Sequence, residues 1–359
     1  MNKNIKAIDI IKAFAIFSVL IIHLYIPQEV TKKYFLYLYT VIGVPIFMII
    51  TGHNYTLSVV YSNSKEFSLK TYFDRFNFYK KIKRLVVPYI YILLLEFYFL
   101  FTKQNFIKYR NKESIIELFV KGGGIGPGSY YTPVLVQIIF IYFPILLLFN
   151  KYLKKLIVNS ITRSIISLFI TIVLEIIYEI IINYFGNIDK ELIQEVYRIS
   201  AFRYLPFLQL GIILYYNKEQ LVKNLKYILP FSIGGGYYIY LTFYKNYTIF
   251  PFYYWKVVAI PVIFYALFFI IIALKYLNNI NNNIFEKFIR LIGKSSYHIF
   301  LVQMIYYGML RINSFNKGIY YIVHIFICLS VGIIFYYIEP KITERLILFI
   351  KKIFRKEIE

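Results

Sequence analysis

The chain has 359 residues and a formal net charge of +23, from 41 Lys and Arg against 18 Asp and Glu. Hydrophobic residues make up 59% of it, charged residues only 16%, and the mean hydropathy is +0.61. So few charges cannot cover a soluble protein of this size, which excludes a soluble globular fold. The single cysteine, Cys328, excludes an intramolecular disulfide, and the four widely separated histidines give no metal-ligand spacing.

Apolar runs follow one another along the whole chain, each close to the ~20 residues that span the hydrocarbon layer of a bilayer. They cover residues 8–26, 35–57, 85–101, 131–149, 164–185, 201–217, 227–243, 256–274, 295–311 and 319–338. The first run is followed by IPQEVTKK, which has no small-residue cleavage site, so we expect a retained helix and not a signal peptide. The sequence predicts an all-α, polytopic membrane protein with about ten transmembrane helices.

The distribution of positive charge predicts the orientation of these helices. With the N-terminus in the cytosol, 27 of the 41 lysines and arginines fall in cytosolic segments. This bias predicts that both termini are cytosolic. The positive charge is then explained by topology and by anionic lipid headgroups, and no nucleic-acid partner is expected. We predict one transmembrane domain over residues 1–340 and a basic cytosolic tail over residues 341–359.

The first apolar run carries three polar side chains, Asp9, Lys12 and His23. Lys12 and His23 are eleven residues apart, about three helical turns, so they would share a face and be separated by ~16 Å along the axis. Asp9 lies one turn before Lys12 on the same face. Polar groups at membrane depth normally face a protein interior or a cavity, where a neutral histidine could accept a proton from a hydroxyl. The alternatives are a packed histidine and a lysine that extends to the headgroups.

Other polar residues in or beside the apolar runs are further candidates. Glu175 and Glu179 stand one turn apart in the fifth run, where they could line a cavity or pair with Arg198 or Arg203. His53 and His298 are interpreted as structural.

Seven segments, in order, resemble the acyltransferase-3 family of membrane O-acyltransferases. The first is Lys12-x10-His23, preceded by Asp9. The others are IGVPIFMIITG (42–52), KKIKRLVVPY (80–89), YYTPVLVQIIFIYFPIL (130–146), FRYLPFLQLG (202–211), LIGKSSYHIFLVQ (291–303) and YYIEP (336–340).

The resemblance implies a multi-pass acyltransferase of the cell membrane. It would move an acyl group, expected to be acetyl, from cytosolic acyl-CoA to a hydroxyl of a cell-surface or exported polysaccharide. His23 would be catalytic, together with Lys12 and Asp9. No bound cofactor or metal is expected.

The resemblance also implies the binding residues. Lys81, Lys83 and Arg84 would hold the CoA phosphates, although the same run is equally explained as a positive-inside signal. Weaker candidates for the acceptor site or cavity are Glu175, Glu179, Arg203 and Tyr131.

The chain departs from the family pattern at several positions. Gln303 stands where the family often has His, Tyr131 and Gln137 where it often has Trp and an acid, and Lys12 where Arg is commoner. Some members carry a fused extracytoplasmic domain, so a separate transfer partner is conceivable. The alternative functions are transfer of succinyl or another acyl group, a non-glycan acceptor, or transport of a glycan or lipid precursor. A transporter would more often show internal repeats.

Overall fold

The structure is a computed structural model that describes residues 6–24, 26–62, 69–73, 75–102, 126–186, 190–251, 256–278, 283–310 and 318–356. Within these ranges every regular element is a helix. Four helical stretches there are long and apolar enough to cross a membrane: Tyr37–Val60, Tyr131–Leu156, Ser160–Phe185 and Tyr320–Phe349. The all-α class is confirmed, while the count of about ten spans and the cytosolic termini stay predictions.

The α-helices, in chain order, have the following bounds. They are α1 (Lys6–Ile22), α2 (Gln28–Lys33), α3 (Tyr37–Thr40), α4 (Gly43–Ser62), α5 (Leu69–Tyr72), α6 (Arg75–Thr102), α8 (Tyr131–Gln137), α9 (Phe143–Leu156), α10 (Ser160–Gly186), α11 (Lys190–Ile199), α12 (Leu205–Lys223), α13 (Leu225–Tyr244), α14 (Pro261–Tyr276), α15 (Ile284–Lys294), α16 (Ser296–Leu310) and α17 (Gly318–Lys356). A π-helical turn, η2 (Ile138–Tyr142), joins α8 to α9, and short 3₁₀ turns η3 (Phe202–Tyr204) and η4 (Lys256–Val258) precede α12 and α14.

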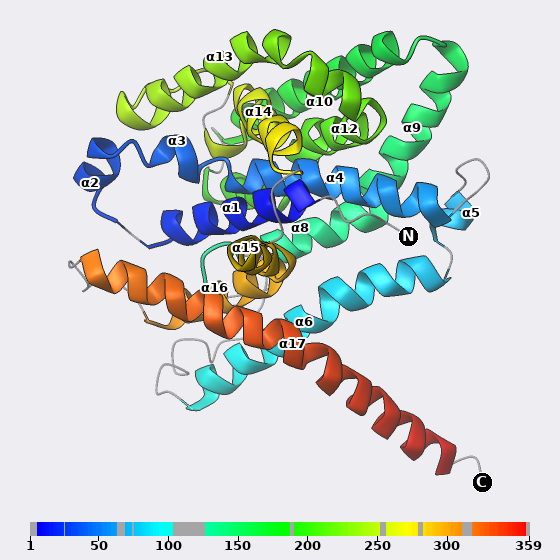
Figure 1. Ribbon diagram of the computed structural model, residues 1–359, viewed down its shortest axis with the longest axis vertical. Coiled ribbons are helices and arrows are strands. Elements are labelled where there is room, and N and C mark those ends of the chain that lie inside the picture. The colour runs from blue at the N-terminus through cyan, green and yellow to red at the C-terminus, as the bar shows by residue number, and fades with distance from the viewer. Residues whose placement is uncertain are drawn as a thin grey trace.

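Helix α1 runs through the middle of the molecule and packs against α4, α14, α15 and α16 (Figure 1). Its small residues Ala7, Ala13 and Ala15 are at most 1% exposed. A Cβ on Gly43 of α4 would lie 2.8 Å from the Ala15 carbonyl oxygen, and one on Gly293 of α15 would lie 1.8 Å from the Asp9 carbonyl oxygen. Small residues let helix backbones approach closely in a membrane, so they fix α1 between its neighbours.

Helices α4 and α12 cross at a similar backbone contact. A Cβ on Gly52 would lie 2.3 Å from the Leu208 carbonyl oxygen, and a Cβ on Gly211 would lie 2.1 Å from the Ile49 carbonyl oxygen. No larger residue fits at either position without moving a helix. Helix α4 is thereby fixed between α1 on one side and α12 on the other.

Helices α10 and α17 form part of the outer surface. In their most apolar stretches only 28% and 17% of the residues are buried inside the protein. Apolar helices that are exposed to this extent are expected where a bilayer covers them. The C-terminal half of α17 extends away from the rest of the helices (Figure 1).

Several helix boundaries differ from the apolar runs. Helix α1 ends at Ile22, so His23 lies in the turn just after the helix and not within it. Pro27 follows and disfavours a helical conformation in the residue before it, so the chain does not continue as helix into α2. Helix α17 runs without interruption through residue 340, where the sequence suggested that a separate tail begins.

Helix α15 was not predicted from the sequence. The Asn283 side chain accepts a hydrogen bond from the Glu286 N–H at 2.8 Å, which is an ordinary helix N-cap. On α15, Ile284, Phe285 and Phe288 are exposed while Glu286 is buried. This amphipathic pattern is too short to register as an apolar run, and it suits a helix at the membrane surface.

Candidate functional site

A cavity of about 290 Å³ lies between α1, α4, α6, α8 and α16, and we call it the α1 cavity. Four cationic side chains line it: Lys12 from α1, Lys81 and Arg84 from α6, and Lys294 from the end of α15. No Asp or Glu is among the lining residues in the part of the chain that the structure describes. An excess of positive charge in a confined space of low polarity favours an anionic ligand.

Asp9 holds Lys12 in place without lining the α1 cavity. The Lys12 Nζ lies 3.3 Å from Asp9 Oδ1, one turn away on α1. The other Asp9 oxygen lies 3.8 Å from Nε of Arg290 on α15. Asp9 is only 7% exposed, so its charge is compensated by these two cations and not by water. The predicted pair is therefore present as an ion pair that orients Lys12.

Lys81 is positioned by aromatic rings. Its ammonium lies 4.6 Å from the ring centre of Tyr72 and 5.5 Å from that of Tyr55. The Tyr72 hydroxyl donates a hydrogen bond of 2.8 Å to the Ile139 carbonyl, which fixes the ring. The cation–π contacts keep the ammonium on the cavity side of α6. Arg84, three residues later, shares this face, whereas Lys83 is not among the lining residues.

Aromatic side chains of α8 and α16 line the same cavity. The Tyr297 hydroxyl donates to the Leu85 carbonyl at 2.8 Å and lies 3.2 Å from the Thr132 hydroxyl. Tyr131 packs against Phe300, with ring centres 5.0 Å apart. These contacts join α6, α8 and α16 into one wall, and they place Tyr131 in the same cavity as Lys12, Lys81 and Arg84.

His23 is not a lining residue of the α1 cavity but lies near one of its walls. Gly128 has a φ of +86°, a backbone conformation that favours glycine. A Cβ at this position would lie 2.9 Å from Cε2 of Phe300 and 4.0 Å from Nε2 of His23. Phe300 lines the cavity, so Gly128 and Phe300 connect the surroundings of His23 with it.

Glu175, Glu179 and Arg203 form a separate cluster. All three side chains are fully buried, and the Tyr197 hydroxyl donates a hydrogen bond to Glu179. Arg203 is close enough to act electrostatically on both carboxyl groups. The arrangement agrees with the partnership with Arg203 that the sequence offered as one interpretation, and none of the three residues is among the described lining residues of the α1 cavity.

Arg203 connects this cluster to the neighbourhood of the α1 cavity. Its Nη2 donates to the Arg198 carbonyl at 2.8 Å and to the Tyr204 hydroxyl at 2.7 Å. Its guanidinium lies 5.5 Å from the ring centre of Tyr130, the residue before Tyr131.

Two glutamines that replace common family residues make structural contacts. The Gln137 amide donates to the Ile199 carbonyl at 2.8 Å and accepts from the Ala201 N–H at 3.1 Å, which ties α8 to the segment before η3. Gln303 is fully buried and donates to the Pro127 carbonyl at 3.4 Å. It therefore supports the loop that carries Gly128.

The histidines interpreted as structural make local contacts. His53 is buried, and its Nδ1 lies 3.2 Å from Oδ1 of Asn54. His298 lies 3.6 Å from a carboxylate oxygen of Glu339 on α17. Neither histidine lines the α1 cavity.

Sequence reasoning missed several lining residues. Lys294, Ser296 and Tyr297 belong to the segment GKSSY, which joins α15 to α16, and Tyr55 and Asn54 belong to α4. A signal for Lys294 exists, because it is a basic residue at the predicted cytosolic end of an apolar run, like Lys12 and Arg84. The residues of α4 carry no such signal, since Tyr and Asn occur throughout this chain.

The helical fold, with four described helical stretches long and apolar enough to cross a bilayer, indicates a membrane protein. A family model described as an acyltransferase domain (Acyl_transf_3) matches residues 5–340, nearly the whole chain. The chain therefore belongs to the acyltransferase-3 family and is a membrane acyltransferase. Comparison with curated proteins gives no match, and comparison with solved structures gives none.

Proposed function

We propose that this acyltransferase moves an acyl group, with acetyl expected, from cytosolic acyl-CoA to a hydroxyl of a cell-surface or exported polysaccharide. The observation that carries the proposal is the α1 cavity, whose described lining residues include four cations and no acid. Coenzyme A carries several phosphate charges on a long flexible arm. Arg binds phosphate through a planar pair of donors, and Lys binds it as a point charge.

In this mechanism, Lys12, Lys81, Arg84 and Lys294 hold the phosphates at the predicted cytosolic end. The pantetheine arm extends between Tyr131, Tyr297 and Phe300, and the thioester reaches the region of Gly128 and His23. Holding the donor next to the acceptor makes the transfer between the two molecules effectively unimolecular, which lowers the entropic part of the barrier.

His23 acts as the general base in the transfer step. Its imidazole takes the proton of the acceptor hydroxyl while that oxygen attacks the thioester carbonyl carbon. A new C–O ester bond forms, and the C–S bond breaks. The sulfur leaves with its electron pair and receives the proton that His23 took from the acceptor, so that free CoA and the O-acylated acceptor are the products and the imidazole is neutral again.

The donor site is tested by binding acetyl-CoA to the purified full chain. The double variant Lys81→Ala/Arg84→Ala removes two cavity cations, and we expect the Kd for acetyl-CoA to rise at least tenfold. Lys83→Ala is the control, because it removes one positive charge from the same helix without changing a lining residue of the cavity. Equal affinity in the double variant and the control would show that the run serves only membrane topology.

A further inference from the structure

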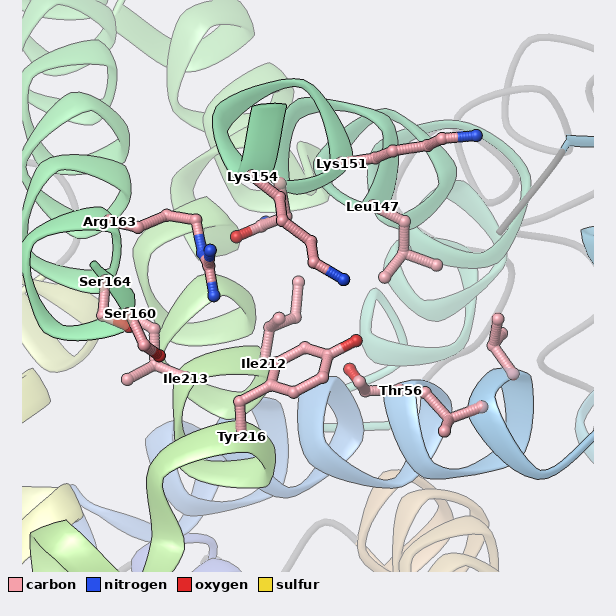
Figure 2. Close-up of a pocket in the computed structure, with 13 residues that line it drawn as sticks. Thr56, Leu147, Lys151, Lys154, Ser160, Arg163, Ser164, Ile212, Ile213 and Tyr216 are labelled. Atoms are coloured by element: carbon pink, nitrogen blue, oxygen red, sulfur yellow. The ribbon is translucent and has the colours of Figure 1, made fainter. Parts of the chain in front are cut away.

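A second cavity, of about 330 Å³, lies between α4, α9, α10 and α12, at the ends that the sequence places in the cytosol (Figure 2). We call it the α10 cavity. Lys151, Lys154 and Arg163 line it, together with several hydroxyl groups. Among the described residues that line it there is no Asp or Glu, and the proposed transfer reaction does not use it.

The polar floor of the α10 cavity is fixed by buried amides. Asn150 and the fully buried Gln209 donate to each other at 2.8 and 3.0 Å, and Gln209 also donates to Ser167 at 2.8 Å. Buried amides are stable only when they are hydrogen-bonded, so this network holds the lining residue Asn150 in one position.

A second buried amide orders the hydroxyl groups. Asn217 lies at a kink of α12 and is 9% exposed. It donates to the Ser164 hydroxyl at 2.9 Å and accepts from the Ser160 hydroxyl at 3.1 Å. Both serines line the cavity, so its wall on α10 is rigid before any ligand arrives.

The cations are arranged around this floor. Figure 2 shows Lys154 and Arg163 extending into the cavity from two different helices, with the hydroxyl groups of Tyr216 and Thr56 directed toward the same space. Lys151 extends away from them. Arg163 donates through Nη1 to the Ile157 carbonyl at 3.3 Å, which orients the guanidinium. The Thr56 hydroxyl donates to the Gly52 carbonyl at 2.7 Å and the Ser160 hydroxyl donates to Asn217, so the Tyr216 hydroxyl is the donor offered to a ligand. Two cations and this hydroxyl around one space match the oxygens of a phosphate group.

The surroundings of the cavity indicate where this phosphate comes from. The turns of α9 and α10 that carry the cations also carry exposed apolar side chains, with Leu156 62% and Ile165 64% exposed. Val60, a lining residue, is 40% exposed. A soluble phosphate needs no apolar surroundings, whereas a phospholipid needs them for its acyl chains.

We propose that the α10 cavity is a phosphate-binding site for the headgroup of an anionic phospholipid in the cytosolic leaflet. Lys154 and Arg163 neutralise the phosphate, and the Tyr216 hydroxyl donates to one of its oxygens. The lipid would stabilise the contact between α9, α10 and α12 as a structural ligand. The proposal is independent of the donor site in the α1 cavity.

The test measures the melting temperature and ligand affinity of the purified full chain in detergent. The probes are short-chain phosphatidylglycerol, short-chain phosphatidylcholine, inorganic phosphate and acetyl-CoA. The test variant is Lys154→Gln/Arg163→Gln. The matched control is Lys155→Gln, an exposed residue of α9 that does not line the cavity.

We expect phosphatidylglycerol to raise the melting temperature of the wild type and of Lys155→Gln, and to bind the double variant at least tenfold more weakly. Acetyl-CoA affinity should stay unchanged in all three proteins, which separates this site from the donor site. An unchanged phosphatidylglycerol affinity in the double variant would refute the proposal. Equal stabilisation by inorganic phosphate, or loss of acetyl-CoA affinity in the double variant, would assign the cavity to a soluble ligand instead.

If the double variant fails to fold, native mass spectrometry of the wild type and of the single variant Lys154→Gln tests whether the cavity retains phospholipid. Copurified anionic phospholipid on the wild type and less on the variant supports the site. Equal lipid retention by Lys154→Gln and Lys155→Gln contradicts it.

Discussion

Asp9 is buried and contacts Lys12 and Arg290, so it neutralises part of the charge next to the α1 cavity without entering it. A carboxylate inside the cavity would repel a phosphate, whereas one behind Lys12 orients the ammonium and leaves the cavity cationic. The position of one acid relative to the lining residues thus decides which ligand charge is favoured.

Replacement of His23 tests the proposed base. His23→Ala should lower the transfer rate by about 10²–10⁴-fold, the usual contribution of a general base, because the His23 imidazole is the proposed base beside Gly128. The measurement is transfer of labelled acetyl from acetyl-CoA to cell-surface polysaccharide in membranes. Acetyl-CoA binding should be retained.

His53→Ala and His298→Ala are the controls for this experiment. Both remove a buried imidazole outside the α1 cavity, and both should cost much less activity. A His23→Ala protein that acylates at the wild-type rate would disprove the base assignment.

Lys81 predicts a pH dependence of donor binding. It precedes the apolar run 85–101, and burial lowers the pKa of its ammonium to about 8. Below this pH the side chain is charged and attracts phosphate, and above it the charge is lost from the free protein. Acetyl-CoA affinity should therefore fall by up to tenfold per pH unit above about pH 8.

The variant Lys81→Arg distinguishes the loss of the Lys81 charge from the titration of other groups that could lower acetyl-CoA affinity. The guanidinium stays charged throughout the range, so the fall in affinity above pH 8 should disappear or weaken. An identical pH profile for wild type and Lys81→Arg would show that another group titrates.

Among the helices, α4 contributes lining residues to both the α1 cavity and the α10 cavity. Thr51, Asn54, Tyr55 and Ser58 face the α1 cavity, whereas Thr56, Val59 and Val60 face the α10 cavity. Its crossing with α12 depends on glycine at positions 52 and 211. The sequence motif that ends at Gly52 therefore has a packing explanation in this fold.

Enlarging Gly211 tests the crossing. Gly211→Val would place side-chain atoms against the Ile49 carbonyl and the His53 N–H, so we expect a loss of about 1–3 kcal/mol of stability. The measurement is thermal unfolding of the purified protein in detergent. Gly234→Ala, on α13, is the control because its Cβ meets nothing within 4 Å, and it should be neutral or stabilising. A melting temperature of Gly211→Val equal to that of wild type would contradict the close crossing.

The lengths of the apolar runs predicted most of the long helices but not the residues at which these helices end. The run 8–26 included His23, whereas α1 ends at Ile22, because a hydropathy pattern does not contain the turn that leads to Pro27. Helix α15 was missed because its stability comes from the Asn283 cap and from packing on α1, and neither produces a long apolar run.

The α1 cavity was predictable only in part. Lys12, Lys81, Arg84 and Tyr131 were candidates through the resemblance, and the structure brings them together. Lys294, Tyr55 and Tyr297 reach the same space from other helices, and no spacing within one segment indicates that convergence. Glu175 and Glu179 were evident as buried acids, yet their distance from the cavity depends on how α10 packs.

At the scale of the whole molecule, the 27 cytosolic lysines and arginines predict a topology that can be measured. Single cysteines placed at Lys155 of α9 and at Lys32 of α2, in a Cys328→Ser background, should be labelled from opposite sides of the membrane. The cysteine at position 155 should be labelled from the cytosolic side, and the cysteine at position 32 from the outside. Labelling of both from one side would overturn the predicted orientation.

Helix α17 has 39 residues, a length of ~58 Å, while the hydrocarbon layer of a bilayer is ~30 Å thick. Nearly half of the helix is therefore surplus to spanning, and Figure 1 shows its last turns projecting away from the other helices. This part acts as a stiff spacer. A fluorescent reporter attached to it would be kept at a distance from the entrances of both cavities. The protein should consequently tolerate a bulky C-terminal fusion better than a fusion at α5, which lies in the chain between α4 and α6, two helices that line the α1 cavity.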